Sequence, residues 1–121
     1  MQKLTKAQED IMHLIWELGE CTVGDLREAI EAKGGTRPAH STVSTLALAL
    51  LDRQFVTAKK YGRTFVYRPA VSREEYGRQS LGQLIKKFFS GSPSLAVSQL
   101  VEHENLSLEE LNALVRKLEE E

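Results

Sequence analysis

One segment of the chain has the pattern of a β-hairpin, whereas the apolar residues of the other segments recur at the spacing of an α-helix. Two β-rich runs, residues 55–60 and 64–69, flank a short turn around Gly62. Such runs on either side of a glycine-containing turn are typical of an antiparallel hairpin. Pro69 ends the second run, because proline cannot donate to a strand ladder. The sequence therefore predicts one two-stranded hairpin among helices.

Three helical segments precede the hairpin. Thr5 and Gln8 have the spacing of a capping box, and the apolar residues after them recur every three or four positions, which predicts a helix over residues 5–18. A strand of one or two residues and a short helix are expected around Thr22, followed by a third helix over residues 39–53. The order helix, strand stub, helix, helix, hairpin is the layout of a winged helix-turn-helix.

The expected third helix has two unlike faces. Val43, Ala47 and Leu50 share the face that should pack on a core. The opposite face carries small hydroxyl residues where long charged ones are usual: Ser41, Thr42, Ser44 and Thr45. Small hydroxyl side chains let a helix approach the floor of the DNA major groove and bond to base edges or phosphates. The alternative is that they only cap and cover the start of the helix.

Charge is spread unevenly, although the formal net charge is −1. Residues 34–70 hold six basic residues and one acidic residue, whereas residues 72–121 hold six basic and nine acidic ones. The candidate phosphate contacts are Arg37 and His40 near the third helix, and Lys59, Lys60 and Arg63 at the hairpin tip. A basic hairpin beside a hydroxyl-rich helix favours duplex DNA as the partner. A solvated surface, lysines that protect a sheet edge and a capping role for His40 remain alternatives.

The tail has apolar stripes but no core of its own. Helices are expected over residues 72–90, 95–101 and 108–118, and so short a segment rarely buries these stripes by itself. The simplest partner is the same segment of a second subunit in a two-fold dimer. The expected interface residues are Leu84, Phe88, Leu100, Leu111, Val115 and Leu118. We expect a mainly α protein with a small β-hairpin: a winged-helix DNA-binding domain in residues 1–71 and a helical dimerisation domain in residues 72–121.

Several other classes of protein find no support. The longest uncharged apolar run, residues 46–51, is too short to span a bilayer, and charges near the amino terminus leave no secretory signal. The lone Cys21 and the spacing of the three histidines form neither a disulfide framework nor a metal site. No phosphate loop, nucleophile elbow or inward carboxylate pair is visible. We therefore expect a cytoplasmic protein that is not an enzyme, needs no metal or cofactor, and does not insert into a membrane.

Motifs spread over nearly the whole chain are similar to those of a known family. They are Leu4-Thr5-Lys6-Ala7, Ile11-Met12-His13-Leu14-Ile15-Trp16, Ser41-Thr42-Val43-Ser44-Thr45-Leu46, Gly62-Arg63-Thr64-Phe65-Val66-Tyr67, Ser72-Arg73-Glu74-Glu75-Tyr76 and Leu106-Ser107-Leu108-Glu109-Glu110-Leu111. In their order and spacing the chain resembles the penicillinase-repressor (BlaI/MecI/CopY) family of bacterial transcription regulators. The resemblance implies a homodimeric repressor whose winged helices bind a palindromic operator.

The resemblance also implies a mode of release. In the family, a membrane sensor protease triggers cleavage within the dimer domain, and the matching bond here is Gln99–Leu100. The β-lactam branch typically has Asn followed by Phe at that bond, and copper-responsive members carry Cys-x-Cys pairs that this chain lacks. Arg53-Gln54 replaces a common Lys-Gly. Ala49 stands where Arg is common, and the missing cation indicates a different operator sequence.

A second class of function stays open at this point. Winged helices also serve as protein-interaction adaptors that bind no DNA. An adaptor has no need of a hydroxyl-rich helix beside a cationic hairpin, so a DNA-binding repressor is the first hypothesis. Salt-dependent binding to duplex DNA separates the two.

Overall fold

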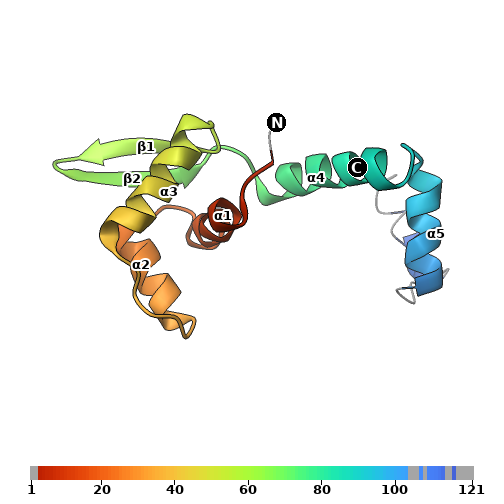
Figure 1. The fold of residues 1–121 in the computed structure, drawn as a ribbon, viewed down its shortest axis with the longest axis horizontal. Helices are drawn as coiled ribbons and strands as arrows, with labels where there is room; N and C mark the ends of the chain where they lie inside the picture. The colour runs from red at the N-terminus through yellow and green to blue at the C-terminus, as the bar shows by residue number, and fades with distance from the viewer. Residues whose placement is uncertain (1–2, 104–106, 108, 114–115, 117–121) are drawn as a thin grey trace. The chain divides into compact units, whose positions relative to one another are not determined.

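The structure, a computed structural model, describes residues 3–103, 107, 109–113 and 116. Its elements follow in the order α1 (Lys6–Leu18), α2 (Val23–Ala32), α3 (His40–Asp52), β1 (Val56–Tyr61), β2 (Thr64–Pro69), α4 (Arg73–Phe88) and α5 (Pro93–His103) (Figure 1). The chain divides into two compact units, Met1–Arg78 and Gln79–Glu121. The first five elements have the order of a winged helix-turn-helix, which confirms the predicted fold class.

The hairpin of the first unit is antiparallel and closed by a tight turn. Tyr61 lies opposite Thr64 at the turn, where Gly62 has φ +62°. A positive φ of this kind favours glycine, which has no Cβ to clash with the backbone. Cys21 forms an isolated bridge to Tyr67, with N–O distances of 3.0 and 2.7 Å in the two directions. The expected strand stub is therefore present, and its bridge adds a second pairing beside that of β1 with β2.

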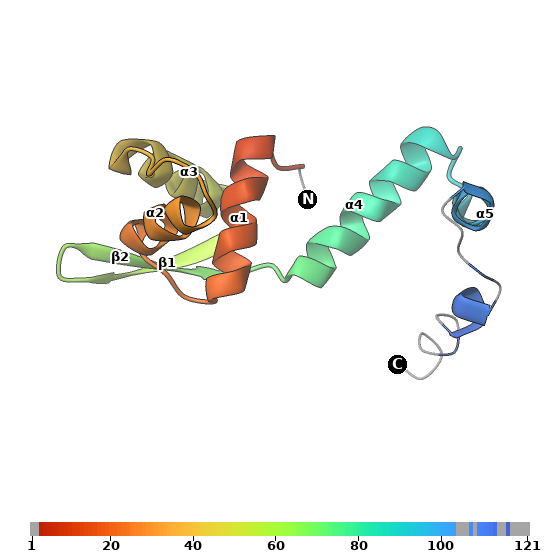
Figure 2. The ribbon, with the colours of Figure 1, turned by 90° about the horizontal axis from the view of Figure 1, so that it is seen from below.

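The core of the first unit lies between α1, α2, α3 and the hairpin (Figure 2). Each helix turns its apolar stripe inward because the stripe recurs at helical spacing. The most deeply buried side chains come from all of these segments: Met12, Ile15, Cys21, Leu26, Val43, Leu50, Phe55, Val56 and Tyr67. The capping boxes at Thr5 with Gln8 and at Thr22 with Asp25 are both formed, which fixes where α1 and α2 begin.

The first turn of α4 belongs to the first unit. Tyr76 is 8% exposed and joins the hydrophobic core. The Nε1–H of Trp16 donates to the carbonyl of Val71 over 2.8 Å, which ties the segment before α4 to α1. The compact unit consequently runs to Arg78, beyond the boundary expected after residue 71.

The second unit contains the rest of α4 and α5. Ser90 and Gly91 both have positive φ between the two helices, and the Gly91 N–H donates to the carbonyl of Ile85 over 3.0 Å. None of the α5 side chains is buried. Large apolar side chains of this unit are exposed: Leu81, Leu84, Phe88, Leu95, Leu100 and Val101. Among the described residues, no helix is long and apolar enough to cross a membrane.

Candidate nucleic-acid interface

The two faces of α3 separate as its sequence predicts. Val43, Ala47 and Leu50 are at most 1% exposed and pack on the core. The hydroxyl residues lie on the other side: Ser41, Thr42 and Thr45 are exposed and Ser44 is partly buried. The outward face of the helix therefore presents short polar side chains to solvent over its first half, and Leu48 is exposed further along the helix.

The start of α3 is left uncapped by side chains. Ala39 is the N-cap residue and provides no side-chain hydrogen bond, and His40 is the first helical residue. The alternative in which His40 or the hydroxyls cap this helix is therefore not what the structure contains. The Nε of Arg27 donates to the carbonyl of Pro38 over 2.9 Å, which holds the entering loop against α2. Free backbone N–H groups at a helix start attract anions.

The hairpin tip carries exposed cations beside exposed rings. The Nζ of Lys59 lies 5.3 Å from the centroid of the Tyr61 ring, and that of Lys60 lies 5.7 Å from the Phe65 ring. These distances allow cation–π attraction, which orients the ammonium groups without removing their charge. Arg63 is exposed at the turn. In Figure 2 the turn projects past α2 and α3, so its cations can reach beyond the surface of the helices.

A shallow hollow of about 360 Å³ joins the helix start to the hairpin. It brings His40 and Ser44 of α3 together with Arg63 of the turn. The remaining lining residues come from the start of α2 and from β2: Thr22, Val23, Gly24, Thr64, Phe65 and Tyr67. The sequence did not predict the part played by α2. Its only signal was the helix start expected around Thr22, which lines the same hollow.

The other cations of the basic segment are engaged within the chain. The guanidinium of Arg37 lies 3.7 Å from a Glu28 carboxylate oxygen, and that of Arg68 lies 3.2 Å from Glu20. Arg53 turns toward the amino terminus and donates to the side chain of Gln8 over 2.6 Å. Arg37 sits ahead of α3 as expected, while Arg53 and Arg68 add less to the outward positive surface than the sequence count implies.

Two titratable side chains, Cys21 and Tyr67, are buried in the core beneath this interface. Burial, with a smaller contribution from Asp25, raises the pKa of the Cys21 thiol to about 11. Burial, and then the neighbouring Cys21, raises the pKa of Tyr67. Both groups are therefore neutral near pH 7. Within the described part of the chain, no group of three or more His, Cys, Asp or Glu side chains could hold a metal ion.

The residues predicted for a dimer interface lie in the second unit. Leu84, Phe88 and Leu100 are exposed and Leu111 is partly buried, and Val115 and Leu118 lie outside the described residues. Leu84, Leu100 and Gln99 also border an apolar hollow of about 270 Å³ between α4 and α5. The Gln99–Leu100 bond lies within α5, and both side chains are exposed.

Relatives with known names match almost the whole chain. The Penicillinase repressor of Bacillus licheniformis is 25% identical over 118 residues, which cover 98% of this chain and 91% of that protein. The Methicillin resistance regulatory protein MecI of Mammaliicoccus sciuri is 25% identical over 112 residues, covering 93% and 89%. A protein of that name from Staphylococcus aureus strain N315 matches to the same extent. The names are those of a repressor and regulators, not of enzymes.

Solved structures and a family profile complete the comparison. A mutant MarR of E. coli has a TM-score of 0.50 to this chain at 14% identity, and the match covers 98% of this chain and 77% of that one. The same mutant in complex with operator DNA also gives a TM-score of 0.50, with 75% of that chain covered. These likenesses concern the fold. The profile of the family described as Penicillinase repressor matches residues 4–120, and the chain therefore belongs to the penicillinase repressor family of transcriptional repressors.

Proposed function

We propose that the protein represses transcription by binding a palindromic DNA operator as a homodimer. The observation that carries the proposal is the hydroxyl-rich outward face of α3, joined to Arg63 of the hairpin across one hollow. The family membership and the names of the relatives support it. The MarR mutant whose fold is similar has been solved with operator DNA, which is consistent with this use of the fold.

Each part of the surface has a distinct role in this proposal. α3 enters the major groove, where Ser41, Ser44 and Thr45 approach base edges and Thr42 flanks them. His40 and Arg37 contact phosphates near the helix start, where the unpaired N–H groups add attraction. The hairpin cations Lys59, Lys60 and Arg63 contact the backbone of the adjacent groove. Base contacts then set the sequence preference, and phosphate contacts set most of the affinity.

The second unit serves as the dimerisation domain in this proposal. Its exposed apolar side chains, Leu84, Phe88 and Leu100 among them, are covered by the same unit of a second copy. Residues 1–71 and 72–121 are the proposed functional domains, and the first turn of α4, with Tyr76, is part of the first compact unit. Two tethered recognition helices bind two half-sites more tightly than one helix binds one.

Release by proteolysis completes the proposed cycle. A sensor protease in the membrane leads to cleavage at Gln99–Leu100, in the cytoplasm where the repressor meets DNA. Cutting there divides α5 and removes part of the apolar surface that holds the dimer. The half-sites are then no longer bound by linked helices, and the affinity for the operator falls.

A bulky substitution on the outward face of α3 tests the proposal. Duplexes are first selected from a random pool by the purified protein. Thr45→Tyr should then weaken binding to the selected duplex by about 1–3 kcal/mol, because the larger side chain keeps the helix from the groove floor. Fluorescence anisotropy measures the affinity, and thermal melting checks the fold. Thr57→Tyr, at an exposed position of β1, is the matched control and should bind like the wild type.

Two results would overturn the proposal. Full operator affinity in Thr45→Tyr would mean that α3 does not face the groove. Absence of any salt-dependent binding of duplex DNA by the wild type would leave the protein-interaction adaptor as the better hypothesis.

A further inference from the structure

The amino-terminal segment connects the end of α3 to the start of α4. The Nη2 of Arg53, just after α3, donates to the carbonyl of Lys3 over 2.8 Å. The next residue, Leu4, donates its backbone N–H to the hydroxyl of Tyr76 over 3.1 Å. Tyr76 lies in the first turn of α4. The end of α3 and the start of α4 are thus joined through one short stretch of extended chain.

The α3 end of this connection is held by several bonds. The Nη1 of Arg53 donates to the Oε1 of Gln8 over 2.6 Å. The same oxygen accepts the backbone N–H of Thr5 over 3.1 Å, as part of the capping box of α1. The guanidinium also lies 5.5 Å from the centroid of the Phe55 ring. Arg53 is therefore tied at once to α1, to the amino-terminal segment and to the start of the hairpin.

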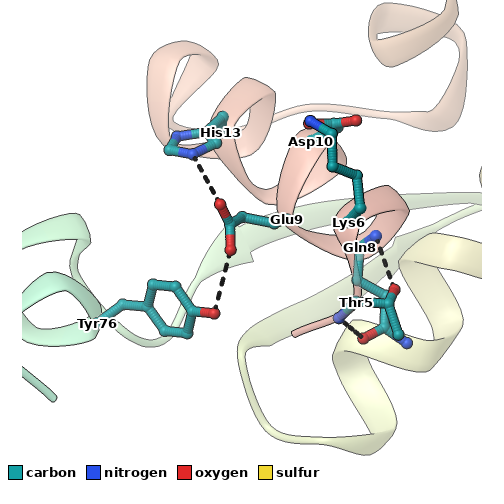
Figure 3. A network of polar contacts seen from close by, with 7 residues as sticks. All are labelled: Thr5, Lys6, Gln8, Glu9, Asp10, His13 and Tyr76. Carbon is teal, nitrogen blue, oxygen red and sulfur yellow. Dashed lines mark hydrogen bonds and ion pairs between the residues drawn. The ribbon is translucent and has the colours of Figure 1, made fainter. Parts of the chain in front are cut away.

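The α4 end is held as closely. The Tyr76 hydroxyl donates to the Oε2 of Glu9 over 3.3 Å, and the other oxygen of Glu9 lies 3.8 Å from the Nε2 of His13. Figure 3 shows the Glu9 carboxylate between the His13 ring and Tyr76. The Tyr76 ring lies 5.7 Å from the Phe55 ring and 5.9 Å from the Trp16 ring, centroid to centroid. Hydroxyl and ring both have partners, so this turn of α4 is held in one position.

We propose that these contacts, which we name the clasp (Lys3, Leu4, Gln8, Glu9, Arg53 and Tyr76), set the operator spacing that the dimer accepts. The inference rests on the proposed function. The clasp holds the first turn of α4 against the end of α3 within the first unit, and α4 is the helix that continues into the second unit. Arg53 and Tyr76 are thus positioning residues: they touch no DNA, yet they decide where the second recognition helix can be.

The reason is geometric. Two recognition helices of a dimer reach one face of a duplex only when they are about 34 Å, or a multiple of it, apart. Inserting or deleting a single base pair turns one half-site by roughly 35° about the axis. A dimer with a fixed α4 accommodates that mismatch only through strained contacts, whereas a dimer with a loose α4 adjusts to it. Loosening the clasp should therefore broaden the range of spacings that are bound.

The test measures a spacing profile with the full-length protein. The probes are a selected palindromic duplex, versions with one base pair inserted or deleted between the half-sites, and a duplex with a single half-site. Tyr76→Phe removes the hydroxyl and keeps the ring, and Arg53→Met removes the guanidinium and keeps the stem. Lys6→Met is the matched control, because Lys6 is an exposed cation of α1 that is paired with Asp10 outside the clasp.

The expected result is a flatter profile for both clasp variants. The ratio of affinities between the best spacing and its neighbours should fall by about 2- to 30-fold, while affinity for the single half-site stays that of the wild type. In the double variant Tyr76→Phe with Arg53→Met, the loss of spacing preference should not exceed the sum of the losses in the two single variants, because both residues act on one junction. Lys6→Met should keep the wild-type profile. Should one variant melt below the assay temperature, the other still decides the question.

Different failures are distinguishable. An unchanged spacing profile in both clasp variants overturns the inference, as does an equal loss on single and double half-sites. A wild type that binds duplex DNA with salt dependence but without spacing preference overturns the inference and leaves DNA binding intact. A wild type that binds no duplex overturns the proposed function together with the inference.

Discussion

Gln54 occupies a backbone position that suits glycine. Its φ is +65°, directly after the C-cap Arg53 of α3. The N–H of Gln54 donates to the carbonyl of Leu51 over 3.0 Å, and the N–H of Phe55 donates to that of Leu50 over 2.9 Å. This pair of bonds is a Schellman motif, whose left-handed residue is usually glycine. The backbone therefore explains why a Lys-Gly pair suits this site, where this chain has Arg53-Gln54 instead.

Gln54→Gly should stabilise the first unit. Removing the Cβ relieves the left-handed strain, which offsets the extra freedom of glycine in the unfolded chain, and the net gain should be about 0.5–1 kcal/mol. Urea denaturation measures the free energy of unfolding. Gln54→Ala keeps the Cβ and serves as the control. An equal gain in both variants would show that the Gln54 side chain, not its φ, is the source of the strain.

Whether a residue's contacts could be predicted from the sequence depends on how far along the chain its partners lie. The capping boxes of Thr5 and Thr22 were predictable, because each joins residues three apart. The inward turn of Arg53 was not, since its partners Gln8 and Lys3 are 45 and 50 positions away. Composition records a cation at residue 53 but contains no sign of where it points. The count of charges in the segment therefore does not say which of its cations face outward.

At the scale of elements, the helices and the hairpin follow from local patterns. The period of apolar residues predicted α1 to α3 to within a few residues, and the glycine turn predicted the hairpin. The hollow between α2, α3 and the hairpin was not predictable, because it depends on how three elements pack. The place of α2 in it was missed for the same reason. Its residues Thr22 and Gly24 look like an ordinary helix start in the sequence.

The hairpin tip should contribute affinity that depends on salt but not on sequence. Replacing Lys59, Lys60 and Arg63 together with Ala should weaken binding to every duplex. The slope of log affinity against log salt should decrease by about 0.9 for each phosphate that the tip no longer neutralises. A salt titration by anisotropy measures this slope.

The control for the hairpin variant removes as many charges elsewhere. Lys6, Lys33 and Arg78 are exposed cations of the first unit that lie outside the proposed interface. Their joint replacement with Ala should change the slope far less. A wild-type slope in the hairpin variant would mean that the tip does not contact phosphates.

At the scale of the whole molecule, the second unit exposes large apolar side chains of the kind that stable proteins usually bury. Phe88 is 66% exposed, and Leu84 and Leu100 are each 46% exposed. Burying one Leu or Phe side chain contributes roughly 1.5–3 kcal/mol, so several from each copy can hold a dimer after the cost of association. The apolar stripes of the tail helices were visible in the sequence. The burial of Tyr76 in the core of the first unit was not.

Phe88→Glu should convert a dimer to a monomer without unfolding it. The side chain is exposed within one copy, so the first unit keeps its melting behaviour, while a charge at the proposed interface opposes association. Sedimentation over a range of micromolar concentrations measures the change. Ser98→Glu, which adds the same charge at an exposed polar position of α5, is the control. A wild type that sediments as a monomer, or a Phe88→Glu variant that stays dimeric, would contradict the proposed dimer.

Cys21 makes the internal motions of the first unit measurable without an engineered cysteine. Its thiol is the only one in the sequence, is 1% exposed, and belongs to a residue paired with Tyr67 in the sheet. An alkylating reagent can react only when that pairing opens, and the high pKa keeps the thiol protonated near neutral pH until then. The time course of alkylation, followed by mass spectrometry, therefore measures the rate at which the fold opens around Cys21. A duplex that binds only the closed form should reduce the alkylation rate in proportion to the fraction of protein that it occupies.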